Sequence, residues 1–169
     1  MSNLRLINEN SGSSITSFSM TDVFSSDFDI YKIVLDTIDF PSEDLFFRFI
    51  NSSGSVVSSA NYDDAVLLQR SYGAFAEERN TNTTSLGSIG FSDLSDKGGA
   101  TVLYVFNPTS TSSYTFSLWQ NAGVSSIGTP VRKGIGVLKQ TASMTGINFN
   151  ASSSILNIRA RIYGLRVDS

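Results

Sequence analysis

The sequence predicts an all-β protein, an antiparallel β-sandwich of about 8–10 strands with at most one short helix. Short segments in which apolar and polar residues alternate recur roughly every ten residues along the chain. Turn-forming sequences rich in Asn, Gly, Pro and Ser separate them, as at Asn51–Gly54, Asn107–Ser110 and Asn150–Ser153. This spacing is typical of a sandwich or a barrel, and we expect the sandwich.

The predicted strands are rich in Ile, Val and aromatic residues, which favour strand over helix. Leu45–Asn51 illustrates the pattern, because Leu45, Phe47 and Phe49 share one face of an extended chain. In chain order, the expected strands are Leu4–Asn8, Ser14–Met20, Asp29–Ile38, Leu45–Asn51, Leu86–Phe91, Thr101–Asn107, Tyr114–Gln120, Val131–Gln140, Met144–Phe149 and Ile155–Val167.

Two segments do not fit the strand pattern. In Tyr62–Tyr72, an Asp at the start could cap a helix and apolar residues follow at helical spacing, so this segment is the one candidate helix. Ala76–Ser85 is polar throughout, and we expect a long exposed loop there. Gly134 and Gly136 lie within a predicted strand, where glycines typically mark a bulge or a close backbone approach.

The last strand has the strictest alternation in the chain. Its predicted core face holds Leu156, Ile158, Ala160 and Ile162, and its opposite face holds Asn157, Arg159, Arg161 and Tyr163. By the same argument, Tyr114, Phe116 and Leu118 are expected to face the core, with Trp119 pointing outward. We therefore expect one half-buried strand at the end of the chain and another around Trp119.

Length and composition favour one domain. The chain has 169 residues, which is enough to bury a core without disulfides. We expect residues 1–22 to form an N-terminal strand or arm, either within the sheet or reaching another subunit, and residues 23–169 to form a single β-sandwich domain. The N-terminus lacks an apolar stretch, so we expect no signal peptide.

Composition argues against several functional classes. The chain has no His and no Cys, so it lacks the usual general base, thiolate ligands and disulfides. Net charge is −3, without the clustered basic surface and aromatic platform that nucleic-acid binding needs. No run of residues is long and apolar enough for a membrane helix. We therefore expect no nucleic-acid partner and no membrane partner.

Carboxylate pairs are the remaining candidates for chemistry. They could support glycoside hydrolysis or, at Asp63/Asp64 and Asp93–Gly99, offer oxygen ligands to Ca²⁺. All of them lie in polar, loop-like sequence without the spacing of a calcium loop, so we interpret them as solvated charges and turn residues. The pairs are Glu43/Asp44, Asp63/Asp64, Glu77/Glu78 and Asp93/Asp96. We therefore predict no catalytic, cofactor-binding or metal-binding residue, and no cofactor.

Aromatic and basic side chains on outward faces are candidates for an interface. Tyr and Trp are common anchors of protein contacts, and Arg is enriched there. The candidate interface residues are Trp119, Arg159, Arg161 and Tyr163. The alternative is that these side chains are simply solvated or are covered within the fold.

Three segments together resemble a set of tailed-phage virion proteins, common in phages of marine and cyanobacterial hosts. They are the strand Leu45–Asn51, the Phe-Asn-Pro segment Val105–Tyr114 with its Ser/Thr turn, and Met144–Leu165, whose last strand ends Ile-Tyr-Gly-Leu. The resemblance spans roughly Asp29 to Leu165. It implies a jelly-roll-like domain and no enzymatic activity.

Members of this set occur as capsid decoration (cement) proteins and as tail-fibre domains. This sequence shows no tail-attachment region and no stalk. The resemblance therefore implies a decoration protein on the outer head surface of a virion, assembled in the host cytoplasm and released by lysis. Expected partners are other copies, as a homotrimer, and the major capsid protein or other virion proteins. The alternative is a tail-fibre or receptor-binding module that contacts a host surface glycan.

Overall fold

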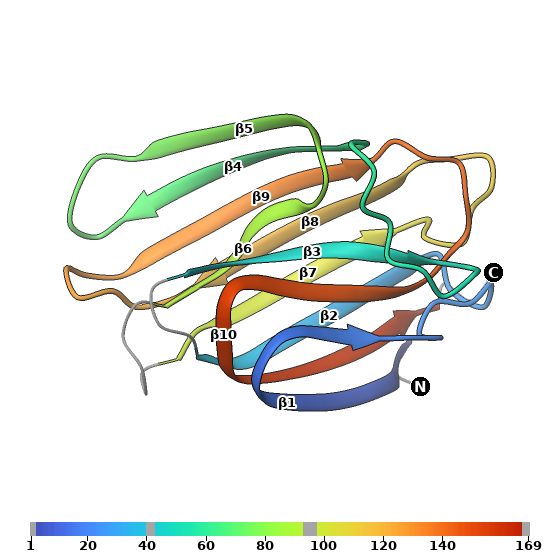
Figure 1. Cartoon of the computed structure of the whole chain (residues 1–169), viewed down its shortest axis with the longest axis horizontal. Coiled ribbons are helices and arrows are strands. Elements are labelled where there is room, and N and C mark those ends of the chain that lie inside the picture. Colours follow the sequence, from blue (N-terminus) through green and yellow to red (C-terminus); the bar gives the residue numbers. More distant parts are fainter. Residues whose placement is uncertain (1–2, 40–42, 93–97, 167–169) are drawn as a thin grey trace.

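The computed structural model describes residues 3–39, 43–92 and 98–166, and these form an all-β protein whose strand pairs are antiparallel (Figure 1). The described part contains no helix, and hence none long and apolar enough to cross a membrane. The predicted fold class is confirmed. The strands are β1 (Leu4–Met20), β2 (Ile30–Asp39), β3 (Glu43–Asn51), β4 (Tyr62–Arg70), β5 (Ala76–Thr83), β6 (Leu86–Ser92), β7 (Ala100–Phe106), β8 (Thr115–Ala122), β9 (Pro130–Leu138) and β10 (Met144–Leu165).

The strands form two layers joined by a long ribbon of β1 and β10. Residues 157–165 of β10 pair with β2, whereas residues 144–151 pair with β3. β1 pairs with β10 along both halves. We call β5, β4, β9, β8, β7, β2 and the adjoining half of the ribbon the large sheet. The small sheet is β6, β3 and the other half of the ribbon, and β6 packs across β8 and β9.

Several predicted boundaries change in the structure. The two expected N-terminal strands are one strand, β1, which lies within the sheet, and the two expected C-terminal strands are one strand, β10. The loop expected at Ala76–Ser85 is wrong, because most of it forms the exposed edge strand β5. The residues of one segment do not indicate which distant strand will complete its backbone hydrogen bonds.

The predicted helix at Tyr62–Tyr72 is also wrong. This segment forms β4, whose Tyr62, Asp64, Val66 and Leu68 alternate inward. β9 pairs with one side of β4 and β5 with the other, so sheet partners satisfy the backbone. Asp64 does not cap a helix, because its carboxylate accepts hydrogen bonds from the Gly87 amide and the Asn80 side chain.

The core lies between the two sheets. On β10, Ile158, Ala160 and Ile162 are buried as predicted, while the side chain of Leu156 lies outside the described part of the structure. Beside them in the same sheet lie Tyr31, Ile33 and Leu35 of β2. The small sheet contributes Leu45, Phe47 and Phe49 of β3. Each inner row is thus apolar near the ribbon that joins the layers.

The predicted orientation of β8 is wrong. Trp119 is only 2% exposed, whereas Phe116 and Leu118 are each 45% exposed and Tyr114 is 43% exposed. The Trp119 ring packs edge-on against Phe47, with 5.9 Å between ring centroids. Its indole lies against Gly134 of β9, which has no side chain to obstruct it. The strand is regular at Gly134, without the expected bulge, and the close approach there is made by the indole side chain and not by another backbone.

We expect Gly134→Ala to destabilise the protein by about 1–3 kcal/mol or more, because overpacking of a filled core costs this much. A Cβ at this position would lie 2.0 Å from Cε2 of Trp119, in the interior of the sandwich. Gly73→Ala is the matched control, since nothing lies within 4 Å of its added Cβ. Urea denaturation followed by Trp fluorescence measures both variants. Equal stability of the two would contradict the packing of Trp119 described above.

Tyr62 carries a buried polar link between the sheets. Its hydroxyl donates to the Val57 carbonyl (2.9 Å) and accepts from the Phe49 amide (3.1 Å). Burial is the main cause that raises the pKa of the Tyr62 phenol to about 12. An unfolded chain would release this proton near pH 10, so the folded state holds it more tightly.

We therefore expect stability to fall as pH rises from about 10 to about 12, by roughly 3 kcal/mol from Tyr62. When folding raises the pKa of a group, the resulting stability is fully present below the pKa of the unfolded state. It is lost as the pH rises through the pKa of the folded state. Tyr62→Phe should be less stable at neutral pH by about 1–3 kcal/mol, since two hydrogen bonds are lost, and its stability should fall less steeply above pH 10. Denaturation at several pH values measures the stability of both proteins. If Tyr62 were solvated, the stability of the wild type and that of Tyr62→Phe would fall in parallel above pH 10.

Candidate interaction surface

The candidate carboxylates all have structural partners where the structure describes their side chains. Asp44 forms an ion pair with Arg132, whose side chain is buried. Asp63 accepts from the Asn82 amide and lies 2.8 Å from the Lys139 ammonium, whose hydrogen bond lowers the pKa of the Asp63 carboxyl. Glu77 pairs with Arg79 at 3.0 Å. These groups hold neighbouring strands together.

The remaining members of the pairs add no catalytic arrangement. An oxygen of Glu78 lies 3.3 Å from the Ser88 hydroxyl, which is equally close to Asp44. The side chain of Glu43, and Asp93 and Asp96 entirely, lie outside the described residues. Within residues 3–39, 43–92 and 98–166, no group of three or more His, Cys, Asp or Glu side chains is placed to hold a metal ion.

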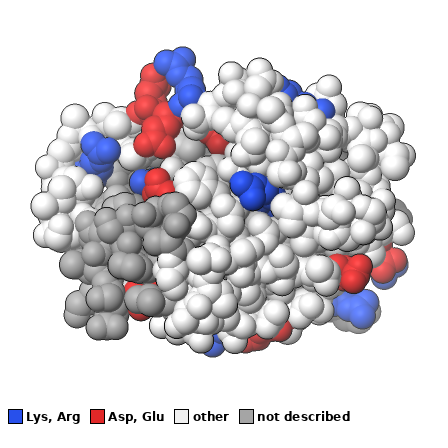
Figure 2. Space-filling model, viewed as in Figure 1, with Lys and Arg blue, Asp and Glu red and all other residues white. Residues whose placement is uncertain are grey.

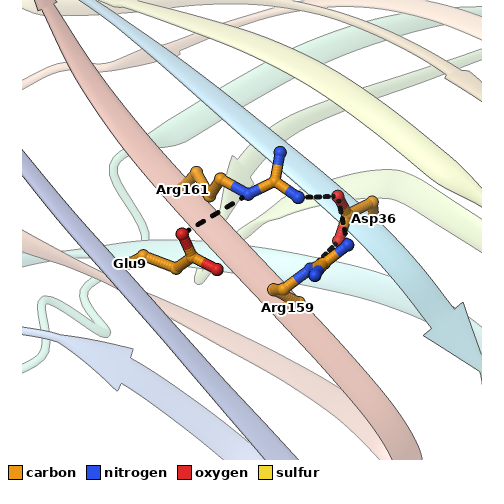
Figure 3. A network of polar contacts seen from close by, with 4 residues as sticks. All are labelled: Glu9, Asp36, Arg159 and Arg161. Atoms are coloured by element: carbon orange, nitrogen blue, oxygen red, sulfur yellow. Dashed lines mark hydrogen bonds and ion pairs between the residues drawn. The ribbon is translucent and has the colours of Figure 1, made fainter. Parts of the chain in front are cut away.

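Arg159, Arg161 and Tyr163 share the outward face of β10, as expected, and the two arginines are paired within the chain (Figure 3). Asp36 of β2 accepts from Arg159 Nε and from an Arg161 guanidinium nitrogen, each at 2.6 Å. Glu9 of β1 lies 3.6 Å from Arg161 Nε. The hydrogen bond and charge of Asp36 raise the pKa of the Arg159 guanidinium. This network ties three strands together, so the arginines do not require an acidic partner.

An extended apolar surface covers the outside of the large sheet, and we call it the outer face. Residues paired directly across neighbouring strands lie on the same face of a sheet. Following the strand pairs gives three adjacent rows. They are Leu67–Lys133–Gln120–Val102–Val34–Arg161–Glu9, Ala65–Ile135–Leu118–Tyr104–Lys32–Tyr163–Leu6 and Asp63–Val137–Phe116–Phe106–Ile30–Leu165–Leu4.

Every member of these rows is partly or fully exposed, so the outer face contacts solvent in the single chain. Ile135 is 55% exposed, and its neighbour Leu118 is 45% exposed. A shallow hollow of about 610 Å³ lies over Phe116, Leu118 and Ile135, and a second of about 400 Å³ lies between Lys32, Tyr104 and Lys133. The outer face is therefore slightly hollowed and mostly apolar along its second and third rows, whereas the first row also carries Lys133, Gln120, Arg161 and Glu9.

On β8, large apolar side chains point outward and several polar side chains point inward. Its outward side chains include Phe116 and Leu118, whereas Thr115, Ser117 and Asn121 point inward and are buried. The side-chain polar atoms of these three inner residues, and Trp119 Nε1, have no hydrogen-bond partner among the described residues. On this strand, Phe116 and Leu118 face water, whereas every inward residue except Trp119 is polar.

Of the predicted interface residues, Tyr163 lies in the middle row of the outer face and Arg161 lies at its border, next to Arg159. Trp119 is on the opposite side of the sheet, and its expected outward direction is wrong. Sequence analysis missed Phe116, Leu118 and Ile135 as surface residues. The pattern that indicates their orientation is Lys133-Gly-Ile-Gly-Val137, whose glycines leave room inside for Trp119 and Leu86.

The opposite side of the molecule is also sparsely charged. Figure 2 shows a face that is largely free of Lys, Arg, Asp and Glu, with acidic and basic groups close together at the edge where β5 lies. There, Glu77 and Arg79 form the exposed ion pair described above.

The segments that carry the phage resemblance hold structural positions. Asn107 adopts a φ of +56°, a conformation that Asn tolerates better than most residues, at the turn after β7. The Pro108 carbonyl then accepts a hydrogen bond from the Met144 amide (2.7 Å), which fixes the start of β10. Near its end, Gly164 lies directly beneath the Phe28 ring. These residues shape the fold and form no catalytic arrangement.

Comparisons with known proteins give little further information. No family model matches the chain, and no curated protein matches it. A fructofuranosidase from Schwanniomyces occidentalis is similar over 95% of this chain and 34% of its own length, with 8% identity and a TM-score of 0.24. Lactose-liganded congerin II is similar over 85% of this chain and 100% of its own, with 12% identity and a TM-score of 0.24. Likenesses this distant carry no argument about function.

We expect Asp36→Asn to lower the urea midpoint more than Glu9→Gln does. Asp36 accepts three charge-assisted hydrogen bonds from two arginines, whereas Glu9 makes one longer contact. High salt should reduce the difference, because part of the interaction is screened. If Glu9→Gln were the more destabilising change, Asp36 would not be the centre of this network.

Proposed function

We propose that the protein is a non-enzymatic structural protein of a phage particle, a decoration (cement) protein on the outer surface of the head. The outer face carries this proposal, because a decoration protein acts through lasting contacts with other virion proteins. The resemblance of the Phe-Asn-Pro and Tyr-Gly segments supplies the phage context. The proposed partners are other copies of the chain, as a homotrimer by resemblance, and the major capsid protein.

The distribution of charged groups supports a contact role over catalysis. The described members of the candidate carboxylate pairs bind arginine, lysine, hydroxyl or amide groups within the fold. Asp63 and Asp64 both line the larger hollow, but each carboxylate is already bound within the fold. Asp63 is held by Lys139 and the Asn82 amide, and Asp64 by the Gly87 amide and Asn80. A chain without Cys can assemble in a reducing host cytoplasm and leave by lysis.

One observation favours a second candidate function, a tail-fibre or receptor-binding module. The hollow of about 400 Å³ places Tyr104 beside Gln120, Lys32 and Lys133, so an aromatic ring lies near groups that can hydrogen-bond a sugar. A host surface glycan is the ligand class that this arrangement would take. It is the smaller of the two hollows, and the apolar rows continue well beyond it.

We expect a tagged copy of the protein to decorate the heads of purified particles of the phage that encodes it. Gold labelling and electron microscopy would measure the positions of the label on head and tail. Decoration predicts many labels over the head surface. Label confined to the tail would overturn the decoration proposal and favour the fibre alternative.

The glycan alternative has its own test. Free protein should block adsorption of the phage to its host only if the protein binds the receptor, and a glycan array would then show selective binding. Gln120→Ala should weaken such binding, whereas Gln69→Ala, at the edge of the large sheet, should not. We expect no blocking of adsorption, since the outer face is apolar over most of its width.

A further inference from the structure

The size of the outer face is close to that of a protein interface. Neighbouring strands lie about 4.8 Å apart and residues on one side of a strand lie about 6.7 Å apart, so three rows across seven strands cover roughly 700 Å². A stable complex buries about 800 Å² on each partner. The fifteen apolar or aromatic positions among the twenty-one cover about 500 Å², which is near the upper end of the 300–600 Å² usual for the largest apolar patch of a monomer. The outer face therefore has the area of one whole side of an interface.

The charges around the outer face are mostly neutralised within the chain. At one end, Asp63 pairs with Lys139, and Glu77 with Arg79. At the other end, Asp36 and Glu9 balance Arg159 and Arg161. An identical surface could thus approach without strong repulsion at either end. Lys32 and Lys133 remain, and their long side chains can extend to the border while their stems stay in the apolar layer.

The shape and chemistry suit a second sheet better than a small polar ligand. Sheets pack face to face about 10 Å apart through interdigitated apolar side chains. The middle row, with Ile135, Leu118 and Tyr104 side by side, has the composition of such a layer. A twofold interface brings the same patch from both subunits, so the apolar part of the face can pack against its own copy.

We infer that the outer face of the large sheet binds a second copy of this chain, outer face against outer face. The pairing would bury Phe116, Leu118 and Ile135, which the single chain leaves about half exposed. This inference rests on the self-association in the proposed function, but it names a twofold dimer and its surface in place of the homotrimer that the resemblance implies. It can be tested on purified protein alone, so its outcome is separate from whether the protein lies on a phage head.

Sedimentation velocity of the purified protein at tens of micromolar tests the inference. The wild type should sediment as a species of twice the 18.3 kDa chain mass. Leu118→Lys and Ile135→Lys, at neighbouring positions of the outer face, should each weaken association by at least about thirtyfold, as loss of a central anchor does. Ile127→Lys is the matched control, because Ile127 is 68% exposed outside the three rows and should leave the dimer intact.

Circular dichroism would confirm that each lysine variant is folded. The chain lacks cysteine, so Leu118→Cys and Ile127→Cys provide a second measurement that adds no charge. Maleimide should modify Leu118→Cys more slowly as protein concentration rises, whereas Ile127→Cys should react at a constant rate. A monomeric wild type, an oligomer that both lysine variants retain, or a Leu118→Cys modification rate that does not change with protein concentration would each overturn the inference. A capsid-protein or glycan occupant would give these results.

Discussion

The structure depends on the pairing of β1 with β10 through the bend between the two sheets. This pairing runs from Leu4 opposite Leu165 to Met20 opposite Ile147, with a shift in register between Ile15 and Ser17. Because β1 pairs with both halves of β10, each strand satisfies backbone groups of the other on either side of the bend. Ile155, which lies opposite Ile15 at the bend, is fully buried. The ribbon therefore sets the position of the small sheet over the large one.

The contacts on either side of the ribbon follow from that geometry. The rings of Phe18 and Phe149, from β1 and β10, stack within the small sheet at 6.4 Å. In the large sheet, Asp36 holds β2 against the same β10 through two arginines (Figure 3). With the layers fixed in this way, Phe47 of the small sheet meets the edge of Trp119. The orientation of β8 is then determined by Trp119, whose ring packs against Phe47 of the small sheet.

The sequence could predict those elements in which local pattern and tertiary environment agree. Strict alternation in the last strand correctly places Ile158, Ala160 and Ile162 inside, because one face of that strand is core. β4 reads equally well as a helix, since two Asp residues precede an apolar run, and only pairing with β5 and β9 decides the outcome. A propensity this balanced is overridden by partners distant in the sequence.

The candidate site was beyond sequence analysis for a related reason. Its residues come from seven strands and meet only through the order β4-β9-β8-β7-β2-β10, with β1 at the border. Tyr163 could be singled out because β10 alternates cleanly. Phe116 and Leu118 could not, because apolar residues on an alternating strand are ordinarily assigned to the core. The assumption fails where a second apolar face is present on the outside of the sheet.

A balance of energies explains why β8 keeps this orientation. A one-residue slip would bury Phe116 and Leu118 and expose Ser117, but would also move Trp119 into water. Half-exposed Phe and Leu forgo about 1 kcal/mol each, and a buried polar group without a partner costs about 1–3 kcal/mol. Against a total stability of about 5–15 kcal/mol, these costs are large for one strand. The packing of Trp119 against Gly134 and Phe47 inside the sandwich favours the present orientation. The apolar side chains outside would recover their share if the proposed second copy covered them. The packing of one indole in the core and the exposure of Phe116 and Leu118 therefore have the same origin.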